Sequence, residues 1–180
     1  MQQVEADSSM SEETDRVTGS VRWYPWVLTL AVVIVLVDQV TKYLAVAALS
    51  DGGVVPVLGD LLSLRLLYNP GAAFSIGTGV TWIFTIVAAV AVAAITRAAW
   101  KVRNRAWALA LGLVLGGATT HLLDRLFREP GFARGHVVDF IDYAGFFVGN
   151  VADICLVVGG ALIVLLYLRG IDIDGRRDRA

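Results

Sequence analysis

The chain is poor in charge, in cysteine and in closely spaced metal ligands. Only 17% of its 180 residues are charged, against about 25% in an average soluble domain. The net charge of -1 gives no reason to expect nucleic acid as a partner. A single cysteine, Cys155, excludes an intrachain disulfide. The two histidines do not form an H-E-x-x-H or similar spacing, so we expect no metal site.

Hydrophobic residues, in contrast, make up 57% of the chain and gather in four long blocks. A membrane-spanning helix needs roughly 20 mostly apolar residues, and backbone that faces lipid must be helical. We therefore predict four transmembrane helices, at residues 26–49, 80–100, 106–123 and 146–168. The first block is longer than the apolar region of a secretory signal and follows an acidic segment, so we predict that it is a retained span.

The distribution of Lys and Arg predicts the direction of the spans. Ten of these residues flank the spans on the side of the two termini, four lie in the opposite segments 50–79 and 124–145, and one lies inside a span. Positive residues favour the cytoplasmic side, which predicts that both termini are cytoplasmic. We expect residues 1–22 to be a disordered cytoplasmic tail, residues 23–169 to form the four-span domain, and residues 170–180 to be a cytoplasmic C-terminal tail.

The two outer segments contain stretches typical of β-strands. Residues 62–68 partly alternate between apolar and polar side chains, after a Gly-Asp pair at 59–60 that suits a hairpin turn. Residues 136–143 are also strand-like, and there Asp139 and Asp142 would lie on opposite faces. The predicted fold class is an all-α membrane protein, a four-helix transmembrane bundle with a small extracytoplasmic sheet.

Ionisable residues inside a span are costly, so each is a candidate functional group. Asp38 and Lys42 are four residues apart on one helix face, which predicts either an ion pair that reaches toward the membrane interface or a functional site. Asp153 lies about two turns into the fourth predicted span, with Asn150 on the same face. A buried carboxylate without a neighbouring cation suits proton transfer, and a structural hydrogen bond to another helix is the alternative.

Asp153 needs a second carboxylate if it is half of an acid–base pair. Asp139 and Asp142 both precede the fourth predicted span closely enough to lie beside it, and their spacing does not choose between them. His121 and Arg125 are four residues apart on one face, at the outer end of the third predicted span. A histidine in such a position is more often a hydrogen-bonding residue than a metal ligand.

Five motifs in order along the chain resemble those of the lipoprotein signal peptidase (signal peptidase II) family. The family patterns are D-Q-x-[ST]-K, N-x-G-A-A-F, the end of G-G-x-x-G-N-x-x-D-R, V-V-D-F and F-N-x-A-D. The matching segments are residues 37–42 (VDQVTK), 69–74 (NPGAAF), 123–125 (LDR), 136–140 (HVVDF) and 150–153 (NVAD). One such motif is a weak signal, whereas five in order, with spans in the right places, are a strong one.

The resemblance implies a four-helix membrane bundle with an outer β-cradle, in which residues 23–169 form a peptidase domain. It implies a plasma-membrane aspartic endopeptidase that removes the signal peptide of prolipoproteins just before the diacylglyceryl-modified cysteine. Asp139 and Asp153 would be the catalytic pair, near the outer leaflet, with no metal or organic cofactor. The residues with implied substrate-binding or supporting roles are Asp38, Lys42, Asn69, Gly71, His121, Arg125 and Asn150.

The implied partners are lipidated prolipoproteins and membrane lipid, and we expect a monomer that the cyclic peptide globomycin inhibits. The chain departs from the family pattern in two places: Thr120-His121 stands where the family has Gly-Asn, and Gly149 where it has Phe. These changes bear on pH optimum and substrate preference, and they leave open a catalytically impaired relative that binds lipidated peptides. A proton-coupled transporter is disfavoured because no repeat is visible, and a structural scaffold because of the intramembrane carboxylates.

Overall fold

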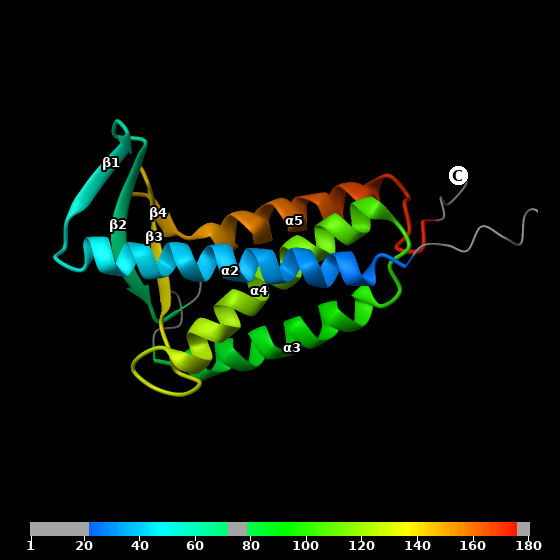
Figure 1. Ribbon diagram of the computed structural model, residues 1–180, viewed down its shortest axis with the longest axis horizontal. Coiled ribbons are helices and arrows are strands. Elements are labelled where there is room, and N and C mark those ends of the chain that lie inside the picture. Colours follow the sequence, from blue (N-terminus) through cyan, green and yellow to red (C-terminus); the bar gives the residue numbers. More distant parts are fainter. Residues whose placement is uncertain (1–21, 72–78, 176–180) are drawn as a thin grey trace, which may run out of the picture.

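The computed structural model describes residues 22–71 and 79–175. Four long helices lie side by side, and a four-stranded antiparallel sheet lies at one end of the bundle (Figure 1). In chain order the elements are α2 (Tyr24–Leu49), β1 (Val54–Leu58), β2 (Leu62–Asn69), α3 (Thr81–Ala99), α4 (Arg105–Phe127), β3 (Val137–Tyr143), β4 (Phe147–Gly149) and α5 (Val151–Leu168). The described residues leave out residues 1–21 of the predicted tail at 1–22, residues 72–74 of the second motif, and the final residues 176–180.

The four helices are each long and apolar enough to cross a membrane, which confirms the four predicted spans. Large apolar side chains point outward from the bundle, as lipid-facing residues must. Leu36 of α2 is 59% exposed, Val90 of α3 is 64% exposed and Val157 of α5 is 72% exposed. The start of α2 and the end of α5 lie together at the end of the bundle away from the sheet (Figure 1). An even number of spans requires this arrangement.

Two predicted helix boundaries are wrong. The fourth span begins at Val151 rather than at residue 146, because Phe147–Gly149 pairs with β3 as strand β4. Asn150 then caps the helix, so Asp153 lies in the first turn of α5 and not two turns inside the span. The third span continues past residue 123 to Phe127, so Asp124 and Arg125 of the third motif lie on the helix.

Both strands predicted outside the spans are present, as β2 and β3, and the turn at 59–60 joins β1 to β2. The strand order is β1-β2-β3-β4, and each neighbouring pair is antiparallel. Leu64 lies opposite Ile141 and Leu67 opposite Asp139, so β2 contains one extra residue between these pairs. Such a bulge bends a strand locally, and here it lies beside the part of β3 that carries Asp139.

Helix α4 packs against the other three helices and lies at the centre of the bundle. Its glycines allow this close approach. A Cβ atom at Gly116 would lie 2.7 Å from Cβ of Ile34 on α2, and one at Gly117 would lie 2.9 Å from the carbonyl oxygen of Ala152 on α5. Close backbone approach through small residues is the usual device of membrane helix packing.

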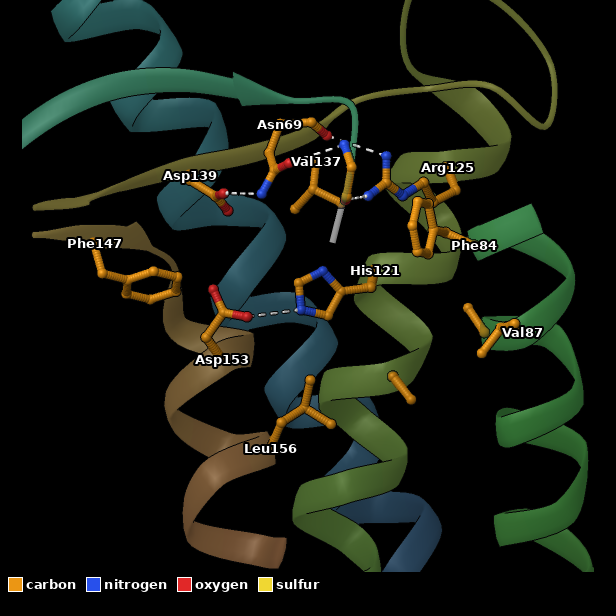
Figure 2. Close-up of a pocket in the computed structure, with 13 residues that line it drawn as sticks. Asn69, Phe84, Val87, His121, Arg125, Val137, Asp139, Phe147, Asp153 and Leu156 are labelled. Carbon is orange, nitrogen blue, oxygen red and sulfur yellow. Dashed lines mark hydrogen bonds and ion pairs between the residues drawn. The ribbon is translucent and has the colours of Figure 1, made fainter. Parts of the chain in front are cut away.

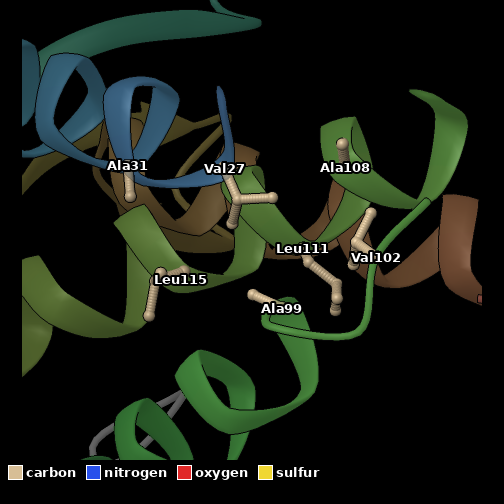
Figure 3. Packing of buried hydrophobic residues seen from close by; sticks show 7 residues of the cluster. All are labelled: Val27, Ala31, Ala99, Val102, Ala108, Leu111 and Leu115. Atoms are coloured by element: carbon tan, nitrogen blue, oxygen red, sulfur yellow. The ribbon is translucent and has the colours of Figure 1, made fainter. Parts of the chain in front are cut away.

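The half of the bundle away from the sheet has an apolar core (Figure 3). Two hydrogen bonds to backbone carbonyl oxygens close this end. The indole Nε1 of Trp107 donates to the carbonyl oxygen of Ile171 at 2.7 Å, and the amide nitrogen of Trp23 donates to the carbonyl oxygen of Val102 at 3.2 Å. The polar residues singled out from the sequence therefore lie in the other half, next to the sheet. The buried apolar cluster consists of Val27, Ala31, Ala99, Val102, Ala108, Leu111 and Leu115.

Candidate active site

A buried ionic cluster joins α2 to α4 just below the sheet. Nζ of Lys42 lies 2.7 Å from Oδ2 of Asp38 and 2.7 Å from Oδ2 of Asp124, and none of the three side chains is more than 1% exposed. Oδ1 of Asp124 also lies 2.7 Å from Nε of Arg128. The predicted Asp38–Lys42 pair therefore forms, but the prediction that it reaches toward the interface is wrong. Helix α4 supplies a second carboxylate, so the ammonium is satisfied inside the bundle.

The ionic cluster holds the backbone next to both candidate catalytic aspartates. Oδ1 of Asp38 accepts a hydrogen bond from the amide nitrogen of Ala152 at 2.9 Å. Oδ2 of Asp124 accepts one from the amide nitrogen of Val138 at 3.3 Å. Ala152 immediately precedes Asp153 and Val138 immediately precedes Asp139. The cluster thus fixes the start of α5 and the start of β3 relative to the first and third spans.

A cavity of about 370 Å³ lies between the sheet and helices α3, α4 and α5 (Figure 2). Asp139 and Asp153 both line it, although they come from different elements. Asp38 and Lys42 do not line it, because they belong to the ionic cluster. The complete lining consists of Asn69, Gly71, Phe84, Val87, Ala88, Ala118, His121, Arg125, Val137, Asp139, Phe147, Asp153 and Leu156.

Asp139 is the more buried of the two carboxyl groups, with 2% of the residue exposed. Its Oδ1 accepts a hydrogen bond from Nδ2 of Asn150 at 2.6 Å, and its Oδ2 accepts one from Nδ2 of Asn69 at 3.0 Å. Desolvation by burial raises the pKa of Asp139 from 3.8 to about 6, with a further increase from the charge of Asp153. The hydrogen bonds from Asn69 and Asn150 and the charge interaction with His121 oppose the rise. The carboxyl group can therefore hold a proton at mildly acidic pH.

Asp153 lies in the first turn of α5, where it forms a reciprocal capping pair with Asn150. Oδ2 of Asp153 accepts from the amide nitrogen of Asn150 at 2.9 Å, and Oδ1 of Asn150 accepts from the amide nitrogen of Asp153 at 3.1 Å. Oδ1 of Asp153 lies 3.2 Å from Nε2 of His121. Since Asn150 also donates to Asp139, this one residue contacts both carboxyl-bearing residues and fixes their relative position.

Asp142, the alternative partner for Asp153, does not line the cavity. Its Oδ2 lies 3.3 Å from Nε of Arg65, and its Oδ1 accepts a hydrogen bond from the amide nitrogen of Gly145 at 2.9 Å. These contacts give it a local role beside the β3–β4 turn. Strand alternation therefore separates the two candidates once the sheet is formed, and the pair that meets at the cavity is Asp139 and Asp153.

Arg125 clamps the backbone at the end of β2 against α4. Its Nη1 donates to the carbonyl oxygens of Asn69 and Gly135, at 3.1 Å each, and its Nη2 donates to the carbonyl oxygen of Gly71. The amide nitrogen of Gly71 donates in turn to Oδ1 of Asn69 at 3.0 Å. These contacts leave Nδ2 of Asn69 directed at Asp139, so Arg125 and Gly71 act on the site through Asn69.

The space beside Asp153 is too small for a side chain at position 149, which explains the glycine there. A Cβ atom there would lie 2.9 Å from Oδ2 of Asp153 and 2.7 Å from Cε1 of Phe147. Phe147 itself lines the cavity (Figure 2). In this chain the aromatic ring beside Asp153 comes from position 147, and no side chain fits at position 149 unless the ring or the carboxylate moves.

Sequence reasoning missed several residues of the site. Thr120 donates to Oδ2 of Asp38 and accepts from Nζ of Lys42 at 3.1 Å, so it belongs to the ionic cluster. Thr120, Asp124 and Arg128 recur every four residues, which places them on one face of α4. That polar stripe is a signal that could have identified the cluster. The apolar lining residues carry no such signal, because their side chains resemble any lipid-facing residue.

The comparisons with known proteins agree with this arrangement. A family model described as Signal peptidase (SPase) II matches residues 30–169. The lipoprotein signal peptidase of Leifsonia xyli subsp. xyli is 49% identical over 151 residues, which cover 83% of this chain and 70% of that protein. The lipoprotein signal peptidase of Rhodococcus jostii is also 49% identical, over 148 residues, which cover 82% of this chain and 75% of that protein.

Solved structures are similar as well. Two structures, each described as a bacterial membrane enzyme, have TM-scores of 0.71 and 0.70 at 28% and 30% sequence identity. The first match covers 87% of this chain and 94% of the solved chain, and the second covers 81% and 94%. These matches confirm the resemblance that the motifs predict and the fold class of a four-helix membrane protein with a small sheet. The chain belongs to the signal peptidase II family.

Proposed function

We propose that the protein is an aspartic endopeptidase that cleaves prolipoproteins immediately before the diacylglyceryl-modified cysteine, with Asp139 and Asp153 as its catalytic pair. The observation that carries this proposal is that both carboxyl groups line one cavity. Among residues 22–71 and 79–175, no Lys or Arg forms an ion pair with either of them. Carboxyl groups that are not neutralised by a fixed cation can exchange protons with water and substrate.

The two carboxyl groups differ in a way that suits an acid and a base. Asp139 holds the proton, because burial raises its pKa to about 6, whereas the side chain of Asp153 is 28% exposed and serves as the carboxylate. Asp153 takes a proton from water as the water oxygen attacks the scissile carbonyl carbon, and Asp139 gives its proton to the carbonyl oxygen. As the tetrahedral species collapses, Asp153 passes its proton to the amide nitrogen of the lipid-modified cysteine, the C–N bond breaks and Asp139 recovers its proton.

We place the sheet and the cavity on the outer side of the plasma membrane. The opposite end of the bundle carries the basic residues between α3 and α4, at positions 101, 103 and 105, and positive residues favour the cytoplasm. A site at membrane level suits a lipidated substrate, because its acyl chains remain in the bilayer while the peptide reaches the cavity. No observation favours the alternative of a catalytically impaired relative that binds lipidated peptides. His121 contacts Asp153 and lines the cavity beside it without filling it.

Cleavage of a diacylglyceryl-modified prolipoprotein by the purified protein in detergent tests the proposal. Asp139→Asn and Asp153→Asn are the variants to compare, with circular dichroism and gel filtration as controls for folding. We expect the wild type to cleave before the modified cysteine, and each variant to be slower by about 10²–10⁴-fold. A folded wild type that leaves the substrate intact, or folded variants that cleave at the wild-type rate, would overturn the proposal.

The pH dependence of kcat/KM gives a second test. Asp139 must be protonated to act as the acid, and its pKa of about 6 lies above the ordinary 3.8, so the active form persists to a higher pH than an exposed aspartate allows. We expect kcat/KM to fall as the pH rises through about 6, since this parameter reports ionisations of the free enzyme. A profile that is flat from pH 5 to pH 9 would contradict this acid–base assignment.

A further inference from the structure

His121 is the cavity residue whose side chain contacts Oδ1 of Asp153. It lies on α4, one turn before Arg125, and its ring points toward Asp153 (Figure 2). Nε2 of His121 and Oδ1 of Asp153 are 3.2 Å apart, and the two side chains are 21% and 28% exposed. The other carboxylate oxygen, Oδ2, already accepts from the amide nitrogen of Asn150. The two contacts together fix the orientation of the carboxylate, and the imidazole holds Oδ1.

The charged and titratable groups around His121 come from three elements. Asp153 belongs to α5, Asp139 and Tyr143 belong to β3, and Arg125 lies one turn away on α4. Helix α3 contributes only apolar lining residues, and Asp38 of α2 bonds to Thr120, the residue before His121. Of these groups, imidazole is the side chain whose charge ordinarily changes between pH 5 and pH 8.

The two states of the imidazole act differently on Asp153. A neutral ring that donates its Nε2 hydrogen orients the carboxylate and leaves it able to accept a proton from water. A protonated ring makes the same contact but places a positive charge beside Oδ1, which makes the carboxylate a weaker base. Asparagine, the family's residue at this position, has no such second state.

We propose that His121 is a positioning residue that orients Oδ1 of Asp153 and, by taking a proton of its own, sets the acid limit of cleavage in this enzyme. The inference rests on the proposed function, since it concerns the base of the same reaction. It predicts that the wild-type pH profile has an acid limb that requires a residue at position 121 that can take a proton. The active pH range is therefore narrower than that of a variant whose residue at 121 cannot be protonated.

His121→Gln is the matched variant, because Nε2 of glutamine lies the same number of bonds from Cα as Nε2 of histidine. It retains a donor for Asp153 and does not titrate. We expect its acid limb in kcat/KM to move by about one pH unit or more toward acid. His121→Asn should move the acid limb in the same direction. Profiles of both variants that superimpose on the wild-type profile would overturn the proposal.

Nuclear magnetic resonance tests the contact without any cleavage. The chain has two histidines, so the imidazole ¹⁵N signals of the full-length protein in detergent are few, and His136→Gln assigns them. At one fixed pH, Asp153→Asn should change the signals of His121 and leave those of His136 unchanged. Asp142→Asn, a matched control outside the cavity, should not change His121. Signals of His121 that do not respond to Asp153→Asn would overturn the proposal.

These measurements separate the inference from the proposed function. A wild type that does not cleave lipidated prolipoprotein would defeat the proposed function, while the response of His121 to Asp153→Asn would still report the contact. Conversely, cleavage with an unchanged acid limb in His121→Gln and His121→Asn would leave the proposed function standing and remove the role of His121.

Discussion

The protein contains two sets of buried aspartates whose surroundings are opposite in kind. Asp38 and Asp124 share the ammonium group of Lys42, with both distances at 2.7 Å. Asp139 and Asp153 lie on the neighbouring cavity, where their contacts are with amides, a backbone N–H group and an imidazole. The two sets are joined directly, because each aspartate of the first set accepts a hydrogen bond from the residue just before an aspartate of the second.

The difference teaches how one residue type can serve two purposes in a membrane. A carboxylate held against a fixed cation stays ionised and works as a rigid anchor, whose loss leaves an uncompensated charge. Burial and a nearby negative charge disfavour the ionised form of a carboxyl group, so such a group keeps its proton to mildly acidic pH and can act as a proton donor there. A position inside a span therefore does not identify a catalytic aspartate. The identity of its neighbours does.

Lys42→Met breaks the ionic cluster and has the largest expected effect on stability. It leaves two buried carboxylates with one cation, Arg128, in place of two, and removal of one partner from a buried ion pair costs about 3–5 kcal/mol. Thermal unfolding in detergent measures the loss. The double variant Asp38→Asn/Lys42→Met also removes one of the unpaired charges, so it should recover part of the lost stability.

Lys101→Met is the matched control for this variant. Lys101 is exposed at the other end of the bundle, and its replacement should change the free energy of unfolding by no more than about 0.5 kcal/mol. Equal melting temperatures for Lys42→Met and Lys101→Met would show that the cluster does not anchor the bundle.

Asp139→Asn has the opposite expected effect on stability, of smaller size. The pKa of Asp139 rises from 3.8 in the unfolded chain to about 6 in the folded protein, a difference worth about 3 kcal/mol. The wild type has this stability in full below pH 3.8 and loses it as the pH rises to about 6. Asparagine does not ionise, so at pH 8 the variant should be as stable as the wild type or more stable, by at most about 3 kcal/mol.

Part of that gain will be offset, because an asparagine at 139 cannot accept from both Asn69 and Asn150. Thermal unfolding at pH 4.5 and pH 8 checks the sign, since the difference between the variant and the wild type must move in favour of the variant at the higher pH. A shift in favour of the wild type would mean that Asp139 is stabilised as an anion, like the aspartates of the cluster.

Much of this arrangement could be predicted from the sequence. The four apolar blocks predict the spans, and two of the strands are predicted by their patterns. The fourth span was placed too early because Phe147–Gly149 is as apolar as the helix that follows. Only its pairing with β3 makes it a strand. Hydropathy gives no information about strand pairing, so a prediction from hydropathy places Asp153 too deep in the fourth span.

The choice between Asp139 and Asp142 shows a second limit of sequence reasoning. Strand alternation predicts that they lie on opposite faces, but it does not say which face meets α5. That is decided by the register of β3 between β2 and β4, which depends on contacts between distant segments. The burial of Lys42 was missed for a similar reason, because its second carboxylate, Asp124, lies on another helix.

The most direct test of the account compares Asp139→Asn with Asp142→Asn. The two aspartates lie on the same strand and are 2% and 6% exposed, so the variants differ mainly in whether the lost carboxylate lines the cavity. The measurement is the initial rate of cleavage of a diacylglyceryl-modified prolipoprotein, per folded molecule. The account predicts a loss of about 10²–10⁴-fold for Asp139→Asn and a rate close to that of the wild type for Asp142→Asn. Equal losses in both variants, or a loss confined to Asp142→Asn, would contradict it.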